Sequence, residues 1–89
     1  MYKSILVIGA PINNNKFKLQ FNNIERGVYK LGIFTMEGQL IKLFSINYLG
    51  ENSIEEYEIG KLLADGKYQL VLFNKKLRIS TSLIKAKSD

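Results

Sequence analysis

Apolar and polar residues alternate along much of the chain in short runs. The clearest run is Lys16 to Asn22, in which Phe17, Leu19 and Phe21 are separated by polar residues. Alternation with a period of two predicts a β-strand with one buried and one solvent-exposed face. Sheets with one solvent-exposed face are usually antiparallel.

Turn-forming residues divide the chain into short runs of this kind at intervals of roughly eight to twelve residues, the spacing of a β-sandwich or barrel. The predicted strands are Ser4 to Gly9, Lys16 to Asn22, Val28 to Met36, Gln39 to Asn47, Ser53 to Ile59, Lys67 to Asn74 and Leu77 to Ala86. We therefore expect an all-β protein, an immunoglobulin-like antiparallel β-sandwich of about seven strands.

Two of the connections have the chemistry of tight hairpins. Glu37-Gly38 supplies a residue suited to positive φ, and Asn74-Lys75-Lys76 forms a similar corner before the last strand. Helical character is confined to Lys61 with Leu62-Leu63-Ala64, which predicts at most about one turn before Asp65-Gly66.

One segment of the chain is repeated. Residues 27–34 and 66–73 share the pattern Gly-x-Tyr-x-Leu-x-aliphatic-Phe. Two copies are too few for a solenoid, so the repeat predicts two strands with equivalent places in the sandwich. In each copy Tyr and Leu should point inward, and the second Tyr has the setting of a tyrosine corner, in which the phenol bonds to upstream backbone. The structural residues of the repeat are Gly27, Tyr29, Leu31, Gly66, Tyr68 and Leu70.

The amino-acid composition limits the classes of function that this chain can have. The 89 residues are 46% hydrophobic and 24% charged, which suits one globular domain spanning residues 1–89. The chain has no Cys and no His, so the commonest general base and metal ligand and every thiol nucleophile are missing. We therefore expect a binding module and not an enzyme.

The remaining polar clusters have ordinary explanations. Of the acidic group Glu55, Glu56 and Glu58, the first should face away from the other two on a strand, so a solvated strand face is favoured over a metal or catalytic site. The hydroxyls of residues 80–82 have no evident activating base. The sequence therefore predicts no catalytic residue, no metal site and no cofactor.

The formal charge of +5 raises the alternative of a nucleic-acid binder. Eleven of the 13 cationic residues are Lys scattered along the chain, with the densest group at Lys75, Lys76 and Arg78. Lysines on exposed edge strands, which discourage aggregation, explain this distribution better. A nucleic-acid binder would instead present one continuous basic groove with aligned aromatic side chains.

The start of the chain has one apolar run, Ile5 to Ala10, which ends at Pro11. A signal peptide needs about seven to fifteen apolar residues followed by a small-x-small cleavage site, so a first β-strand is favoured. The sequence contains nothing close to the roughly 20 apolar residues of a transmembrane helix.

Residues 11–85 resemble the C-terminal sorting domain of proteins that Bacteroidetes bacteria export through the type IX secretion system. The motifs that carry the resemblance occur in the family's order: Pro11-Ile12-Asn13-Asn14-Asn15, Phe17-x-Leu19-x-Phe21-Asn22-Asn23-Ile24, Gly27-Val28-Tyr29-x-Leu31-x-Ile33-Phe34, Gly38-Gln39-Leu40-Ile41, Tyr57-Glu58-Ile59, residues 63–70 and Leu83-Ile84-Lys85. The chain departs from the family at Ile8 to Asn13, where an aromatic-Pro-Asn-Pro opening is usual, and in the extension Ala86 to Asp89.

The resemblance implies an immunoglobulin-like sandwich that acts as an address label for a cargo domain preceding it. The implied partners are the type IX translocon with its outer-membrane shuttle and a C-terminal signal peptidase that removes the domain. The implied location is the periplasm in transit to the cell surface or the medium. By this resemblance the recognised surface lies on the last strand, and we expect Arg78, Leu83, Ile84 and Lys85 to contribute to it.

A second hypothesis is a stand-alone sandwich module for adhesion or for binding a protein or glycan. Its contacts would be exposed edge strands or tyrosines such as Tyr48. A long open edge along the last strand would favour it.

Overall fold

The alternating runs of the sequence form the seven strands of the computed structural model, in which residues 2–12, 14–50, 54–60 and 63–86 are described. The strands are β1 (Ser4–Ile8), β2 (Lys16–Asn22), β3 (Gly27–Thr35), β4 (Leu40–Tyr48), β5 (Ile54–Glu58), β6 (Gly66–Phe73) and β7 (Arg78–Lys85). Each predicted run begins and ends within one residue of the observed strand. The predicted start of the fifth run, Ser53, lies outside the described residues. The prediction of an all-β fold with about seven strands is confirmed.

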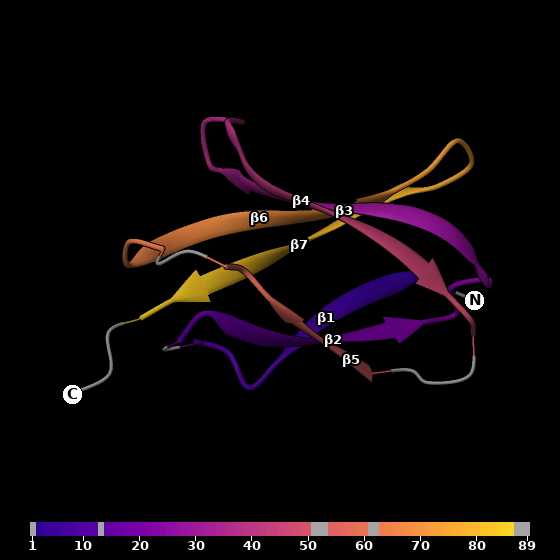
Figure 1. Ribbon diagram of the computed structural model, residues 1–89, viewed down its shortest axis with the longest axis horizontal. Coiled ribbons are helices and arrows are strands. Elements are labelled where there is room, and N and C mark those ends of the chain that lie inside the picture. Colours follow the sequence, from indigo (N-terminus) through magenta and orange to yellow (C-terminus); the bar gives the residue numbers. More distant parts are fainter. Residues whose placement is uncertain (1, 13, 51–53, 61–62, 87–89) are drawn as a thin grey trace.

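The strands form two antiparallel sheets that lie face to face (Figure 1). One sheet has the order β1-β2-β5 and the other has the order β4-β3-β6-β7. In immunoglobulin constant domains the fourth strand belongs to the sheet of the first two strands, whereas β4 here pairs with β3. The immunoglobulin-like part of the fold prediction therefore stays a prediction.

The core lies between the sheets, where both contribute apolar side chains. On β2, Phe17, Leu19 and Phe21 are buried while Lys16 and Lys18 are exposed, as the alternation predicts. The residues that are almost completely buried are Leu19, Leu31, Ile33, Ile59, Leu70, Leu72 and Leu83. Because β3 and β6 are the two central strands of the larger sheet, they supply most of this list.

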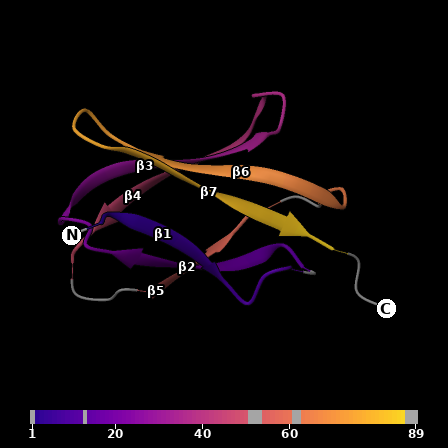
Figure 2. The ribbon, with the colours of Figure 1, turned by 180° about the vertical axis from the view of Figure 1, so that it is seen from behind.

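The sheets also meet along one edge, where β1 lies against β7 (Figure 2). After β1 the chain crosses to the other sheet, and Ile12 forms a parallel bridge with Lys85. Its N–H donates to the Ile84 carbonyl at 2.9 Å and its carbonyl accepts from the Ala86 N–H at 2.8 Å. The segment from Ser4 to Ile12 is therefore bonded to both sheets, and Ile5 and Val7 are part of the core.

Both predicted hairpins are present. At the β3–β4 turn Gly38 has a φ of 91° and donates its N–H to the Thr35 carbonyl, while Asn74 and Leu77 are bonded across the β6–β7 turn. The predicted helical turn is not seen at Leu63 and Ala64, which have no helical structure; Lys61 and Leu62 lie outside the described residues. Asp65 directly precedes β6, which begins at Gly66, so the segment is the connection that enters this strand.

Candidate functional site

The last strand alternates between the core and the solvent, and this alternation separates the four predicted recognition residues. Arg78 and Ile84 are exposed on the outer face of the larger sheet. Leu83 is fully buried and Lys85 is only 6% exposed. Arg78 and Ile84 are therefore accessible to a partner in the folded domain. Leu83 and Lys85 instead pack in the interior.

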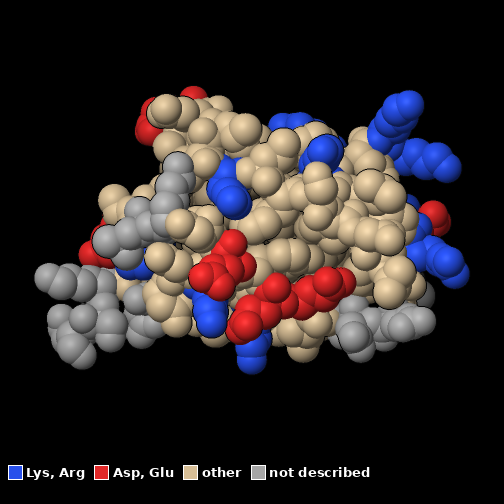
Figure 3. Space-filling model, in the orientation of Figure 1, with Lys and Arg blue, Asp and Glu red and all other residues tan. Residues whose placement is uncertain are grey.

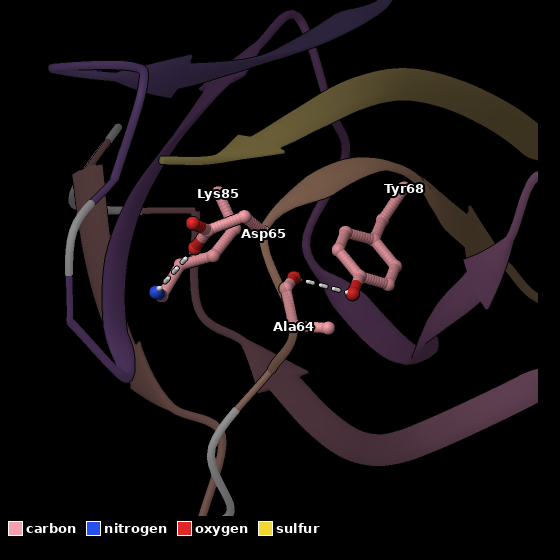
Figure 4. A network of polar contacts seen from close by, with 4 residues as sticks. All are labelled: Ala64, Asp65, Tyr68 and Lys85. Carbon is pink, nitrogen blue, oxygen red and sulfur yellow. Dashed lines mark hydrogen bonds and ion pairs between the residues drawn. The ribbon is translucent and has the colours of Figure 1, made fainter. Parts of the chain in front are cut away.

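Lys85 is the one buried charged residue among the described residues, and it has a carboxylate partner. Its Nζ donates to Oδ1 of Asp65 at 3.4 Å, across the loop that precedes β6 (Figure 4). Asp65 is half exposed, so the pair lies at the boundary between core and solvent. This arrangement buries the aliphatic stem of the lysine and leaves its charge beside the carboxylate.

Along its outer edge β7 has no strand partner within the described ranges except at its end, where Ile12 bridges Lys85. In the described part of the chain, backbone groups from Arg78 to Leu83 on that side are paired with neither sheet, although β1 lies against β7. Ser80 and Ser82 are exposed and Thr81 is half-buried, and the Ser80 hydroxyl accepts a bond from the Gln69 side chain at 3.4 Å. The serines therefore belong to an exposed edge strand.

The repeated segment forms two tyrosine corners at the starts of β3 and β6. The hydroxyl of Tyr68 donates to the Ala64 carbonyl at 2.6 Å (Figure 4), which confirms the predicted corner. The hydroxyl of Tyr29 donates in the same way to the Glu25 carbonyl at 2.6 Å. Because β3 and β6 are antiparallel neighbours, the two corners fix the entry loops at opposite ends of the sheet.

We expect Tyr68→Phe to lower the free energy of unfolding by about 1–2 kcal/mol, because the Ala64 carbonyl loses a donor while the ring keeps its packing. Chemical denaturation measures this change. The same substitution at Tyr29 should have a similar effect, since the two bonds have equal length and span. Unchanged stability in both variants would show that neither bond holds its loop.

A different tyrosine belongs to β5 and packs against side chains of β2 and β4. Tyr57 packs its ring against Phe17 and Phe44, with centroid distances of 5.6 and 5.5 Å. Its hydroxyl is buried without a hydrogen-bond partner among the described residues. Burial raises the pKa of Tyr57 well above its ordinary value, and the carboxylate of Glu55 raises it further.

This raised pKa predicts a dependence of stability on alkaline pH. Tyr57 ionises near pH 10 in the unfolded chain and at higher pH in the folded one, so the unfolded state releases its proton first. Stability should therefore be intact below about pH 10 and fall above it. In Tyr57→Phe we expect a shallower fall between about pH 10 and 11.5, with stability at neutral pH unchanged or slightly higher.

The measurement is urea denaturation at a series of pH values. Tyr2→Phe is the matched control, since the Tyr2 side chain is 90% exposed. An equally steep alkaline fall in Tyr57→Phe and in the wild type would contradict the assignment of this effect to Tyr57.

Tyr48, a proposed surface contact, is buried instead. Its ring stacks on Phe21 with a centroid distance of 4.6 Å and it is 5% exposed. The position follows from the register, because β4 turns alternate residues toward the core and Tyr48 lies on the same face as Ile46. The prediction that Tyr48 contacts a partner is therefore wrong for the folded domain.

The acidic side chains on the solvent-exposed side of β5 lie on one face of the molecule (Figure 3). Glu56 and Glu58 are exposed and lie opposite Lys18 and Lys16 of β2, while Glu55 points to the other face. Opposite charges on neighbouring strands favour this pairing. Among the described residues no three His, Cys, Asp or Glu side chains gather as a group that could hold a metal ion.

Basic residues far apart in the sequence come together at one end of the sandwich, which sequence reasoning missed. Lys3 and Arg26 line a hollow with Lys75 and Lys76 of the β6–β7 turn. The only available signal was Lys75-Lys76 itself, because no local pattern brings Lys3 and Arg26 to that turn.

The chain matches no family model, no curated protein and no solved structure. The described ranges contain no helix with the length and apolar character that a membrane crossing would need. The sorting-domain resemblance therefore stays a hypothesis drawn from the order of the sequence motifs.

Proposed function

We propose that this protein is a sorting domain that directs an attached cargo protein through a type IX secretion system across the outer membrane. The proposal rests on the family's order of motifs and is supported by their positions in the fold. The Phe17 motif forms β2, the two Gly-x-Tyr-x-Leu motifs open β3 and β6, and the motif ending in Lys85 closes β7.

The structural observation that best supports the proposal is the accessibility of β7. The strand that the resemblance assigns to recognition is an edge strand whose outer face is exposed. Arg78, Ser80, Ser82 and Ile84 form that face. A translocon component can contact this strand while the domain remains folded, because its core-facing residues need not move.

The test fuses the whole chain, residues 1–89, behind a Sec signal and a fluorescent reporter in a type IX-competent bacterium. The whole chain is needed because β1 contributes Ile5 and Val7 to the core, although the resemblance begins only at Pro11. Reporter in the medium or on the cell surface that disappears in a translocon-deficient strain is the expected result. Periplasmic retention in both strains would overturn the proposal.

The exposed residues of β7 make a sharper test. We expect Arg78→Gln combined with Ile84→Ser to reduce export severalfold while the purified domain keeps its unfolding midpoint. Lys18→Gln combined with Ile54→Ser is the matched control, since both residues are exposed on strands of the other sheet. Equal export of the two double variants would remove this face from recognition.

The outer edge of β7, which β1 lies against without strand pairing among the described residues, also favours the second candidate, a stand-alone module that binds an extended peptide by adding it as a strand. Backbone bonding along Arg78 to Leu83 would supply affinity, and pockets for alternate side chains would supply specificity. Retention of the reporter in the periplasm, together with capture of an extended peptide by the purified domain, is the outcome that supports this function instead.

A further inference from the structure

Three segments of the chain meet around a hollow of about 640 Å³ at one end of the sandwich. Lys3 comes from the segment before β1, Glu25 and Arg26 from the loop before β3, and Lys75 and Lys76 from the β6–β7 turn. The volume falls within the range of about 300–1,000 Å³ that is common for ligand pockets. The hollow shares no lining residue with the exposed face of β7 that carries the proposed function, although its Leu77 directly precedes Arg78.

Each of the two loops that flank this hollow is fixed by specific bonds. In the β6–β7 turn, Oδ1 of Asn74 accepts the N–H groups of Lys76 and Leu77 at 2.8 and 2.9 Å, and Nδ2 donates to the Val28 carbonyl at 3.3 Å. The same side chain thus shapes the turn and ties it to β3. The bonds of the Asn74 side chain therefore hold Lys75 and Lys76 beside the start of β3.

The loop before β3 is fixed by the Tyr29 corner, in which the phenol bonds to the Glu25 carbonyl at 2.6 Å. Its other side packs on Gly50, where an added Cβ would lie 3.4 Å from the Cβ of Arg26. Gly50 has a φ of 78°, a conformation that favours glycine, so the close approach depends on that residue. Arg26 therefore extends from an anchored backbone.

The charge of the hollow is strongly positive. Four cationic side chains line it against the single carboxylate of Glu25. Basic side chains project from this end of the molecule in Figure 3, whereas acidic side chains cover β5 on the front face. A hollow with like charges on several walls raises the local concentration of anions.

We propose that this hollow binds a compact anion that carries two or more phosphate groups. Lysine ammonium groups act as point charges for phosphate, and the Arg26 fork can hold two phosphate oxygens at once. The one aromatic side chain of the lining is Tyr29, which is buried and uses its hydroxyl in the corner. A nucleobase would therefore find no exposed ring to stack on there, and this favours a phosphate cluster over a nucleic-acid strand.

The test titrates the whole chain with tripolyphosphate at low ionic strength, followed by amide chemical shifts and by calorimetry. We expect saturable binding, with the largest shifts at Arg26 and at Lys75 to Leu77. Lys75→Gln with Lys76→Gln should weaken binding by roughly five- to tenfold, because each exposed cation contributes modestly. Citrate and an oligonucleotide of equal charge should bind more weakly than tripolyphosphate.

The control is Lys18→Gln with Lys67→Gln, two exposed lysines outside the hollow, which lowers the net charge from +5 to +3 as the first pair does. We expect a change of less than about twofold. Equal weakening in both pairs would overturn the proposal in favour of attraction by net charge alone. Shifts spread over the surface without saturation, or tighter binding of the oligonucleotide, would overturn it as well.

Discussion

Replacing Leu70 by alanine is expected to lower the free energy of unfolding by about 3 kcal/mol, and the expected range is about 2–5 kcal/mol. Leu70 is fully buried on β6, one of the two central strands, and is paired with Ile33 on one side and Thr81 on the other. Neighbours on both sides are held by sheet bonding, so the cavity cannot close by moving one strand. A domain of this size is stable by only about 5–15 kcal/mol, so such a loss is large.

Urea denaturation measures the change as a shift of the midpoint at constant slope. Leu49→Ala is the matched control, because it deletes the same atoms from a side chain that is 58% exposed. We expect the control to change stability by less than about 0.5 kcal/mol. A similar loss in both variants would mean that burial between the sheets is not what stabilises this fold.

The sequence predicted the strands closely because each strand is determined by residues that are near one another in the chain. In β2 the alternation of Phe17, Leu19 and Phe21 with polar residues defines both the strand and its buried face. Gly38 and Asn74 end the neighbouring strands with turn chemistry that works within a few residues. Tyr68 was predicted correctly for the same reason, since its partner Ala64 is only four residues away.

Features that depend on which strands become neighbours were not predictable in this way. Strand β4 pairs with β3, but nothing in its own residues specifies which sheet it joins. Tyr48 was assigned to the surface because its partner Phe21 belongs to the other sheet. Lys3 and Arg26 meet the β6–β7 turn only after the sheets have packed, so the basic hollow has no local signature.

The last strand shows how one segment can serve the core and a partner together. Its inward positions include Leu83 and Lys85, and its outward positions include Arg78 and Ile84. A motif that covers Leu83, Ile84 and Lys85 therefore contains two residues that pack in the interior and one that is exposed to a partner. Loss of export on changing Lys85 would be ambiguous unless the stability of the same variant is known.

Lys85→Glu is expected to lower the free energy of unfolding at neutral pH by about 3–5 kcal/mol, the range for a buried charge without a partner. The introduced carboxyl would occupy a site that is 6% exposed and would face Asp65, which now lies 3.4 Å from the lysine Nζ. Burial and the like charge would both raise the pKa of that carboxyl. Part of the lost stability should therefore return as the pH falls toward about 5, where the group is protonated.

Lys85→Met is the matched control, because methionine keeps the long apolar stem and leaves Asp65 half exposed and hydrated. We expect its stability to stay within about 1 kcal/mol of the wild type. Denaturation at pH 7 and pH 5 tests both variants, and the reporter fusion tests whether the stable one is exported. Export of Lys85→Met at the wild-type level would make Lys85 a packing residue. Loss of export at full stability would make its charge part of the signal. If Lys85→Glu were as stable as the wild type at pH 7, the ammonium group would not be confined beside Asp65. Lys85 would then be neither a packing residue nor a fixed charge of the signal.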